Sequence, residues 1–318
     1  MNLFVFGMGY SARAVHRRMA ARLDHISGTT RSAQKAAGLE EGGIEAFVFD
    51  GARRDPRIAE ALPSANHVLA SIGPDETLDG VCDPVLRHYR NDLTAARPVA
   101  IVYLSTVGVY GDHGGAWVDE ESPCRPVSKR SKWRLAAEAA WQRFAAETGI
   151  PVAIIRLSGI YGPGRGPFQK LKEGTSRRII KPGQVFNRIH VDDIAQITEA
   201  AFDRRASGLF NGTDDEPAPP QDVIVHAAGL LGIEPPPEVP FEDADLSAMA
   251  RTFYGENKRV RNEKIKTELG VSLAFPTYRE GLAAILAAER QSWLRSMSDD
   301  GSKKPAALTR RGLVCFRR

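Results

Sequence analysis

The start of the chain carries a glycine pattern that could bind a diphosphate. The sequence GMGYSA places Gly7, Gly9 and Ala12 directly after the apolar run Leu-Phe-Val-Phe at 3–6. The first glycine makes a tight turn, the second lets the backbone approach a pyrophosphate, and the small third residue lets helix and strand pack closely. The N-terminus of the following helix offers unpaired N–H groups to the anion. We therefore predict a dinucleotide site that includes Gly7, Gly9, Tyr10, Ser11 and Ala12.

The end of the second predicted strand carries information on which dinucleotide binds. An acidic residue there accepts a hydrogen bond from the ribose 2′-OH of NAD, whereas arginine accommodates the 2′-phosphate of NADP. The sequence TTRSAQK has Arg31 and Lys35 at this point and no carboxylate. This favours NADP over NAD, unless these are ordinary solvated cations. Asp50, at the end of the third strand, is placed to touch the adenine end and is equally suited to cap a helix.

The elements that must position these residues form a repeating pattern of strands and helices. Predicted strands at 3–6, 24–30, 46–49, 67–72 and 99–104 alternate with helical stretches. Such alternation predicts an α/β fold, a doubly wound parallel sheet of the Rossmann type, with ligands at the carboxyl ends of the strands. The end of the fourth strand therefore adds Ser71, Ile72 and Gly73 to the predicted dinucleotide site.

Six further motifs follow in order along the chain. They are YLSTVGVYG (103–111), SKRSK (128–132) followed by Glu138, RLSGIYGPG (156–164), RIHVDDIA (188–195), GLFNGTDDEP (208–217) and KRVRNEKIKTELG (258–270). Together they resemble an extended short-chain dehydrogenase/reductase of the NAD-dependent epimerase/dehydratase kind, particularly its atypical members. The resemblance covers roughly residues 1–290.

The resemblance implies roles for two residues and shows that one residue typical of the family is missing. Thr106 would hydrogen-bond a substrate oxygen, and Lys132 would hold the nicotinamide ribose. In the family a tyrosine four residues before that lysine carries the proton, and the ammonium makes its phenol more acidic. Here the position is Ser128. A phenol starts near a pKa of ~10, whereas an aliphatic hydroxyl is far less acidic, so Ser128 could not become a comparable base near neutral pH.

Several replacements for the missing tyrosine stay open at this stage. Tyr110 belongs to the VYG motif and could act as a surrogate acid, although the family uses that tyrosine mostly for structure. Tyr254 and Lys258 form a YxxxK string, but it lies in the expected substrate domain. A site of hydroxyls alone, with Thr106, Ser128 and Lys132, could bind or polarise a carbonyl. The dinucleotide could also bind without turnover.

Other groups with chemical potential have simpler interpretations. His190 and Asp192 could form a relay, but their motif in the resembling family mainly fixes a strand-to-helix return. The adjacent carboxylates at 119–121 lie in a predicted loop and do not share a face. The three cysteines are Cys82, Cys124 and Cys315. They are too scattered for a metal site or a disulfide framework and indicate a reducing compartment, so no metal is expected.

Basic residues recur in segments that, by resemblance, approach the substrate cleft. They are Arg177, Arg178, Lys181, Arg188, Lys258, Arg259 and Arg261. Two arginines near one cleft could clamp a phosphate or carboxylate, so an anionic substrate is one expectation. Solvated surface charges are the alternative.

Composition bounds the remaining possibilities. The chain has 318 residues, of which 42% are hydrophobic and 26% charged, and its net charge is +4. Residues 296–318 hold six basic and two acidic residues, which accounts for all of that charge. This argues against specific binding of nucleic acid. No signal peptide and no apolar run of roughly 18 residues is visible, so we expect a cytoplasmic protein without a membrane span, as a monomer or homodimer.

The resemblance predicts a discontinuous domain organisation. Residues 1–165 and 186–213 would form the dinucleotide-binding domain, and residues 166–185 and 214–295 a smaller substrate domain. Helices are expected at 223–231 and 278–294. The polar segment 296–318 lacks helical periodicity and is predicted to be a disordered basic tail.

These observations lead to two hypotheses about function. The first is an NADP-binding oxidoreductase or epimerase/dehydratase that acts on a carbonyl, sugar or nucleotide-sugar compound. The second is a catalytically silent protein that senses NADP or serves as a scaffold. An intact dinucleotide turn beside an altered catalytic position fits both hypotheses.

Overall fold

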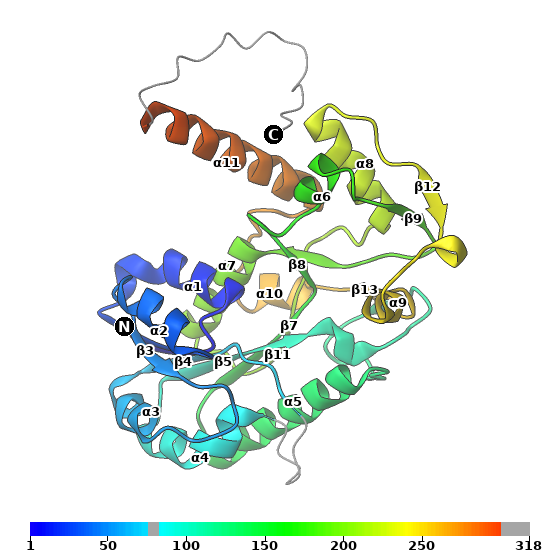
Figure 1. Cartoon of the computed structure of the whole chain (residues 1–318). Coiled ribbons are helices and arrows are strands. Elements are labelled where there is room, and N and C mark those ends of the chain that lie inside the picture. Colours follow the sequence, from blue (N-terminus) through cyan, green and yellow to red (C-terminus); the bar gives the residue numbers. More distant parts are fainter. Residues whose placement is uncertain (76–82, 300–318) are drawn as a thin grey trace.

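A seven-stranded parallel sheet forms the centre of the computed structural model, which describes residues 1–75 and 83–299 (Figure 1). Its strand order is β11-β7-β5-β4-β1-β2-β3. The strands are β1 (Asn2–Phe6), β2 (His25–Thr30), β3 (Glu45–Val48), β4 (His67–Ala70), β5 (Ala100–Thr106), β7 (Val152–Leu157) and β11 (Gly208–Gly212). This confirms the predicted doubly wound Rossmann sheet. The order reverses between β1 and β4, where such sheets leave a crevice for a ligand.

Helices cover both faces of this sheet (Figure 1). One face carries α1 (Tyr10–Met19), α2 (Ala33–Glu40) and α7 (Val191–Asp203), and the other carries α3 (Pro56–Ala61), α4 (Pro84–Ala96) and α5 (Lys129–Thr148). Side chains alternate along β1, so that Leu3 and Val5 join the core under α1 and α7, and Phe4 and Phe6 join the core over α4 and α5. Burial on both faces explains why β1 reads as a continuous apolar run.

A small lobe packs above the carboxyl ends of the strands (Figure 1). It is built from α6 (Phe168–Lys172), β9 (Arg178–Ile180), α8 (Pro220–Leu231), β12 (Glu238–Pro240), α9 (Ala248–Tyr254) and α11 (Tyr278–Asp299). Phe168, Ala227, Tyr278 and Leu282 belong to its own core cluster. Strands β9 and β12 pair in parallel. The predicted helices at 223–231 and 278–294 are confirmed as parts of α8 and α11.

The remaining elements are short. They are β6 (Trp117–Val118), β8 (Gly159–Tyr161), β10 (Arg188–His190), β13 (Arg259–Val260), α10 (Glu263–Thr267) and short 3-10 turns at Ala20–Arg22, Leu62–Ser64, Val107–Tyr110 and Phe241–Asp243. None of the helices within the described ranges is both long and apolar enough to cross a membrane.

Part of the segment that was predicted to belong to the substrate domain packs with the sheet instead. Strand β13 pairs with β6, and Ile265, Leu269 and Val271 are buried in the core under α1 and α7. Part of the segment 214–295 therefore lies with the sheet, and not with the small lobe. Helix α11 also continues to Asp299, so residues 296–299 of the predicted disordered tail are helical. Residues 300–318 lie outside the described part of the chain.

Candidate functional site

The glycine turn has the shape that a diphosphate needs. Gly7 has a φ of +92°, and a Cβ there would lie 2.5 Å from Ile72 Cγ2, so both backbone conformation and space require glycine. Gly9 precedes α1 with a φ of −90°, and the nearest atom to a Cβ there would be Gly7 O at 4.0 Å. The fold therefore leaves open space at Gly9. Helix α1 has neither a side-chain cap nor an acidic residue in its first turn. Its N–H groups are suited to an anion.

Tyr10 connects the start of α1 to the loop that follows β8. Its hydroxyl donates to Pro163 O at 2.9 Å, and the guanidinium of Arg165 lies 5.7 Å from its ring centre. Burial raises the pKa of the Tyr10 phenol. Ser11 and Ala12 are buried, as close packing of α1 on the sheet requires. Tyr10 thus holds the loop beside the predicted anion site.

The ends of β2, β3 and β4 place the other predicted dinucleotide contacts. Arg31 is exposed directly after β2. Asp50 accepts a hydrogen bond from Ala52 N at 2.9 Å beside a hollow of about 530 Å³ lined by residues 48–50 and 52–56. Ser71 N donates to Phe6 O at 2.8 Å, which fixes the loop after β4 against the glycine turn.

Hydroxyl groups gather where β5 ends and α5 begins. Ser128 caps α5 by accepting from Ser131 N at 3.1 Å, and the Ser128 hydroxyl donates to Ser131 Oγ at 2.9 Å. Thr106 Oγ1 accepts from Gly108 N at 3.1 Å. A Cβ on Gly108 would lie 3.1 Å from Ser131 Oγ and 3.4 Å from Thr106 Oγ1, so both hydroxyls border the same glycine. We call Thr106, Ser128 and Ser131 the hydroxyl cluster; Ser131 was missed by sequence reasoning.

Two of the cations near the start of α5, Lys132 and Arg134, differ in where they point. Lys132 is exposed, and within the described residues its ammonium has no hydrogen-bond or ion-pair partner. Arg134 turns toward the sheet, where its Nη1 donates to Tyr103 Oη at 2.9 Å, to Leu104 O at 3.0 Å and to Ile72 O at 3.4 Å. Arg134 was also missed. Its orientation could have been found from spacing, because position 134 falls on the same helical face as the buried Glu138 and Trp141.

Tyr110 lies in a buried polar network beneath the hydroxyl cluster. Its hydroxyl donates to Asn211 Oδ1 at 2.8 Å, and burial raises its pKa to about 12. The guanidinium of Arg156 lies over the Tyr110 ring at 4.8 Å and pairs with Glu138 at 2.8 Å, while Ser105 donates to that carboxylate. The side chains of Arg156 and Glu138 are only 3% and 2% exposed. Tyr110 therefore belongs to the support of the site and does not reach its surface.

The other sequence candidates are used for structure. His190 Nδ1 accepts from Asp192 N at 3.2 Å and caps α7. Tyr254 packs against Phe186 and Phe241 in the small lobe. Lys258 of the YxxxK string donates to Gly111 O and to Glu256, each at 2.7 Å.

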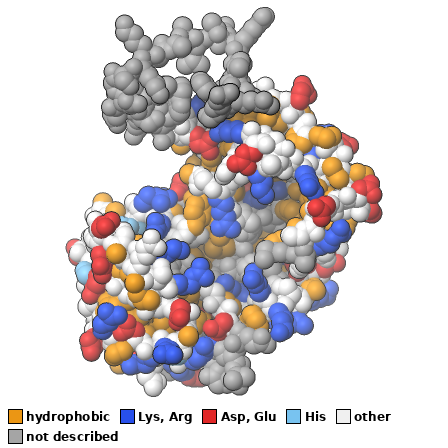
Figure 2. Space-filling view, viewed as in Figure 1, with side chains coloured by type: hydrophobic (Ala, Val, Ile, Leu, Met, Phe, Trp, Pro, Cys, Tyr) orange, Lys and Arg blue, Asp and Glu red, His pale blue; other side chains and the backbone are white. Residues whose placement is uncertain are grey.

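The basic residues predicted near the cleft are already engaged with the protein. Arg178, Lys258 and Arg261 form ion pairs with Glu238, Glu256 and Glu263. Those that donate to backbone carbonyl oxygens are Arg177, Lys181, Arg188 and Arg259. Figure 2 shows that the molecule is hollowed between its two lobes and that Lys and Arg side chains gather around this hollow.

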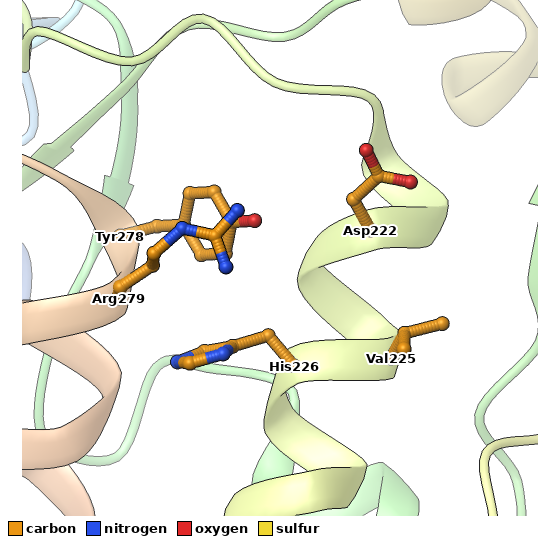
Figure 3. A pocket seen from close by; sticks show the side chains of 5 residues that line it. All are labelled: Asp222, Val225, His226, Tyr278 and Arg279. Atoms are coloured by element: carbon orange, nitrogen blue, oxygen red, sulfur yellow. The ribbon is translucent and has the colours of Figure 1, made fainter.

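A separate hollow of about 310 Å³ lies in the small lobe between α8 and α11. Asp222, Val225, His226, Tyr278 and Arg279 line it, and the Arg279 guanidinium lies over the Tyr278 ring at 4.8 Å (Figure 3). None of the candidate site residues predicted from the sequence lines this hollow. In the described part of the chain, no group of three or more His, Cys, Asp or Glu residues could hold a metal ion.

A comparison with protein families gives this geometry its context. The model of the NAD-dependent epimerase/dehydratase family matches residues 86–211, which run from α4 through the hydroxyl cluster to β11. The chain belongs to the NAD-dependent epimerase/dehydratase family. This confirms the resemblance found in the sequence, whereas the role of the tyrosine missing at position 128 stays a prediction.

Proteins with very different descriptions resemble the chain. A solved structure of a functionally unknown conserved protein from Silicibacter pomeroyi DSS is 47% identical, with a TM-score of 0.81 over 90% of this chain and 98% of its own. A 3-diazoavenalumate denitrifying reductase from a Streptomyces species is 28% identical over 52% of this chain, and the match spans 58% of that reductase. Human epimerase family protein SDR39U1, solved with NADPH, is 19% identical with a TM-score of 0.69 over 90% of this chain and 99% of its own, which shows the shared fold.

Proposed function

We propose that the protein is an NADP(H)-dependent reductase of a small carbonyl compound. The observation that carries this proposal is the hydroxyl cluster where β5 ends and α5 begins, together with a glycine turn that has open space at Gly9. The cluster offers hydrogen-bond donors and lacks a group that could serve as a base near neutral pH. NADPH would supply a hydride to the carbonyl carbon.

The absence of a phenol at position 128 favours reduction over the alcohol oxidation that begins epimerase and dehydratase reactions. Oxidation of an alcohol requires a base to take the hydroxyl proton, and serine and threonine are poor bases near pH 7. Reduction forms an alkoxide that is basic enough to take its proton from water, so a hydrogen-bond donor to the carbonyl oxygen is sufficient. Thr106 or Ser131 donates a hydrogen bond to that oxygen, and the proton that completes the new alcohol comes from water through these hydroxyls.

The choice of NADP(H) has two supports. Arg31 follows β2 where NAD-binding folds often place a carboxylate,. A structure of SDR39U1 contains NADPH, and one relative is described as a reductase. The basic residues predicted near the cleft each have a partner within the protein, so we do not assign them to an anionic group of the substrate. A reducing compartment such as the cytoplasm suits this chemistry.

The test measures NADPH binding by fluorescence and NADPH consumption by absorbance against a panel of aldehydes and ketones. Thr106→Val removes one donor and should lower kcat by about tenfold or more without changing the NADPH Kd. Thr94→Val is the control, because Thr94 also loses a hydrogen bond, to Arg90 O on α4, away from the site. Failure to bind NADPH or NADH would reject the proposal. Tight binding without consumption, equal in wild type and Thr106→Val, would instead favour the dinucleotide-sensing function.

A further inference from the structure

Arg134 has a guanidinium that is anchored on one side only. Its Nη1 holds Leu104 O, Tyr103 Oη and Ile72 O, and so ties the end of β5 to the loop after β4. Its Nη2 lies 3.6 Å from the position of a Cβ on Gly73, the residue predicted to border the dinucleotide. Within the described ranges, Nη2 and Nε of Arg134 have no hydrogen-bond acceptor.

We propose that Arg134, and not Lys132, is the cation that binds the nicotinamide-side ribose hydroxyls of the dinucleotide. This inference rests on the proposed function, since it assumes that a dinucleotide binds at the glycine turn. The family resemblance gave this role to Lys132, whereas the orientation of α5 supports Arg134.

The helical phase of α5 separates the two cations. Ser131 is buried against Gly108, and Glu138 is buried seven residues later, so the face that includes 131, 134 and 138 points to the sheet. Lys132 lies one residue after Ser131, which rotates it by about 100° around the helix axis. Its exposed side chain follows from that rotation.

The chemistry of a guanidinium suits the geometry of two adjacent hydroxyls. Arginine presents its N–H groups in a rigid planar fork, and here Nη1 fixes the plane of that fork against backbone oxygens. The remaining donors are preorganised, so little side-chain entropy is lost when a ligand accepts from them.

The experiment compares NADPH with 2′,5′-ADP, a fragment that lacks the nicotinamide ribose. Arg134→Ala and Arg134→Lys should each raise the NADPH Kd by about tenfold to a hundredfold and leave the Kd of 2′,5′-ADP unchanged. Arg130→Ala is the matched control, because it removes an equally charged, exposed arginine from the same helix. Thermal unfolding of each variant reports whether α5 remains packed.

Different results would overturn different claims. If Lys132→Ala raises the NADPH Kd more than Arg134→Ala does, or if the Arg134 variants leave the NADPH Kd unchanged, the assignment of Arg134 is wrong. Equal weakening of NADPH and 2′,5′-ADP would show that Arg134 serves only to hold the strand ends together. If the wild-type protein binds neither compound, the proposed function fails before the inference is reached.

Discussion

The two ends of the predicted dinucleotide site are built on different principles. At the glycine turn the backbone makes the site, because Gly7 needs a positive φ and Gly9 leaves empty space. At the start of α5, side chains make it, because the hydroxyl cluster and Arg134 depend on how that helix is rotated. A site made by backbone is recognisable in the sequence and tolerates few changes, whereas a site made by side chains can change its chemistry while the fold stays.

The largest expected effect concerns the support beneath the side-chain end. Glu138→Gln leaves the buried guanidinium of Arg156 without its carboxylate, and we expect a loss of about 3–5 kcal/mol in the free energy of unfolding,. Glu147→Gln on the same helix is the control. Glu147 pairs with Arg90 at the surface, so its loss should cost less than about 1 kcal/mol,. Urea unfolding measures both; similar losses would show that the buried pair gives no special support.

The glycine turn allows a test that separates folding from binding. Gly7→Ala should destabilise the fold by about 2–4 kcal/mol, because of its φ of +92° and the contact with Ile72,. Gly9→Ala has room for its methyl group and should leave the melting temperature unchanged. It should nevertheless weaken NADPH binding, because the methyl group occupies the space of the pyrophosphate. Unchanged NADPH affinity in Gly9→Ala would place the dinucleotide elsewhere.

The side-chain end can be tested by restoring a phenol. Ser128→Tyr should raise the rate of carbonyl reduction, by up to about 100-fold, if the rest of the site is assembled around position 128. The change also removes the cap of α5, at a cost of about 1 kcal/mol,. Ser128→Ala isolates that cost, so the comparison of kcat is made between the two variants. Equal rates in both would mean that a phenol at 128 does not reach the substrate.

The smallest expected effect concerns the choice of dinucleotide. Arg31→Ala should raise the Kd of NADPH by about tenfold and leave the Kd of NADH unchanged, because only NADPH carries the 2′-phosphate. Isothermal titration gives both constants. A wild-type protein that already prefers NADH would contradict the role given to Arg31.

The sequence predicted the backbone-made features well. Apolar runs ended by glycine marked β1 and β4, and an apolar run ended by Ser105 and Thr106 marked β5, because buried parallel strands have strong local signals,. Asp119, Glu120 and Glu121 were correctly expected in a loop, although Glu120 there accepts from Asn211 N at 2.7 Å. These features depend on residues close to one another in the chain.

The side-chain end was harder to predict for a physical reason. Spacing from Ser128 pointed to Lys132, but which face of α5 meets the sheet depends on distant partners such as Gly108 and Arg156. The return of Ile265 and Leu269 to the sheet core also depends on a long-range pairing, that of β13 with β6. Such contacts carry no local signal in the sequence.

The parallel pairing of β11 with β7 limits when this part of the sheet can fold during synthesis. β11 ends at residue 212 and supplies Asn211, the acceptor for the Tyr110 hydroxyl. A nascent chain that has not yet emerged beyond that residue carries β7 as an unprotected apolar edge, and pairings between distant segments form slowly. The buried polar network around Tyr110 is therefore completed only late in synthesis, when more than half of the polypeptide has left the ribosome.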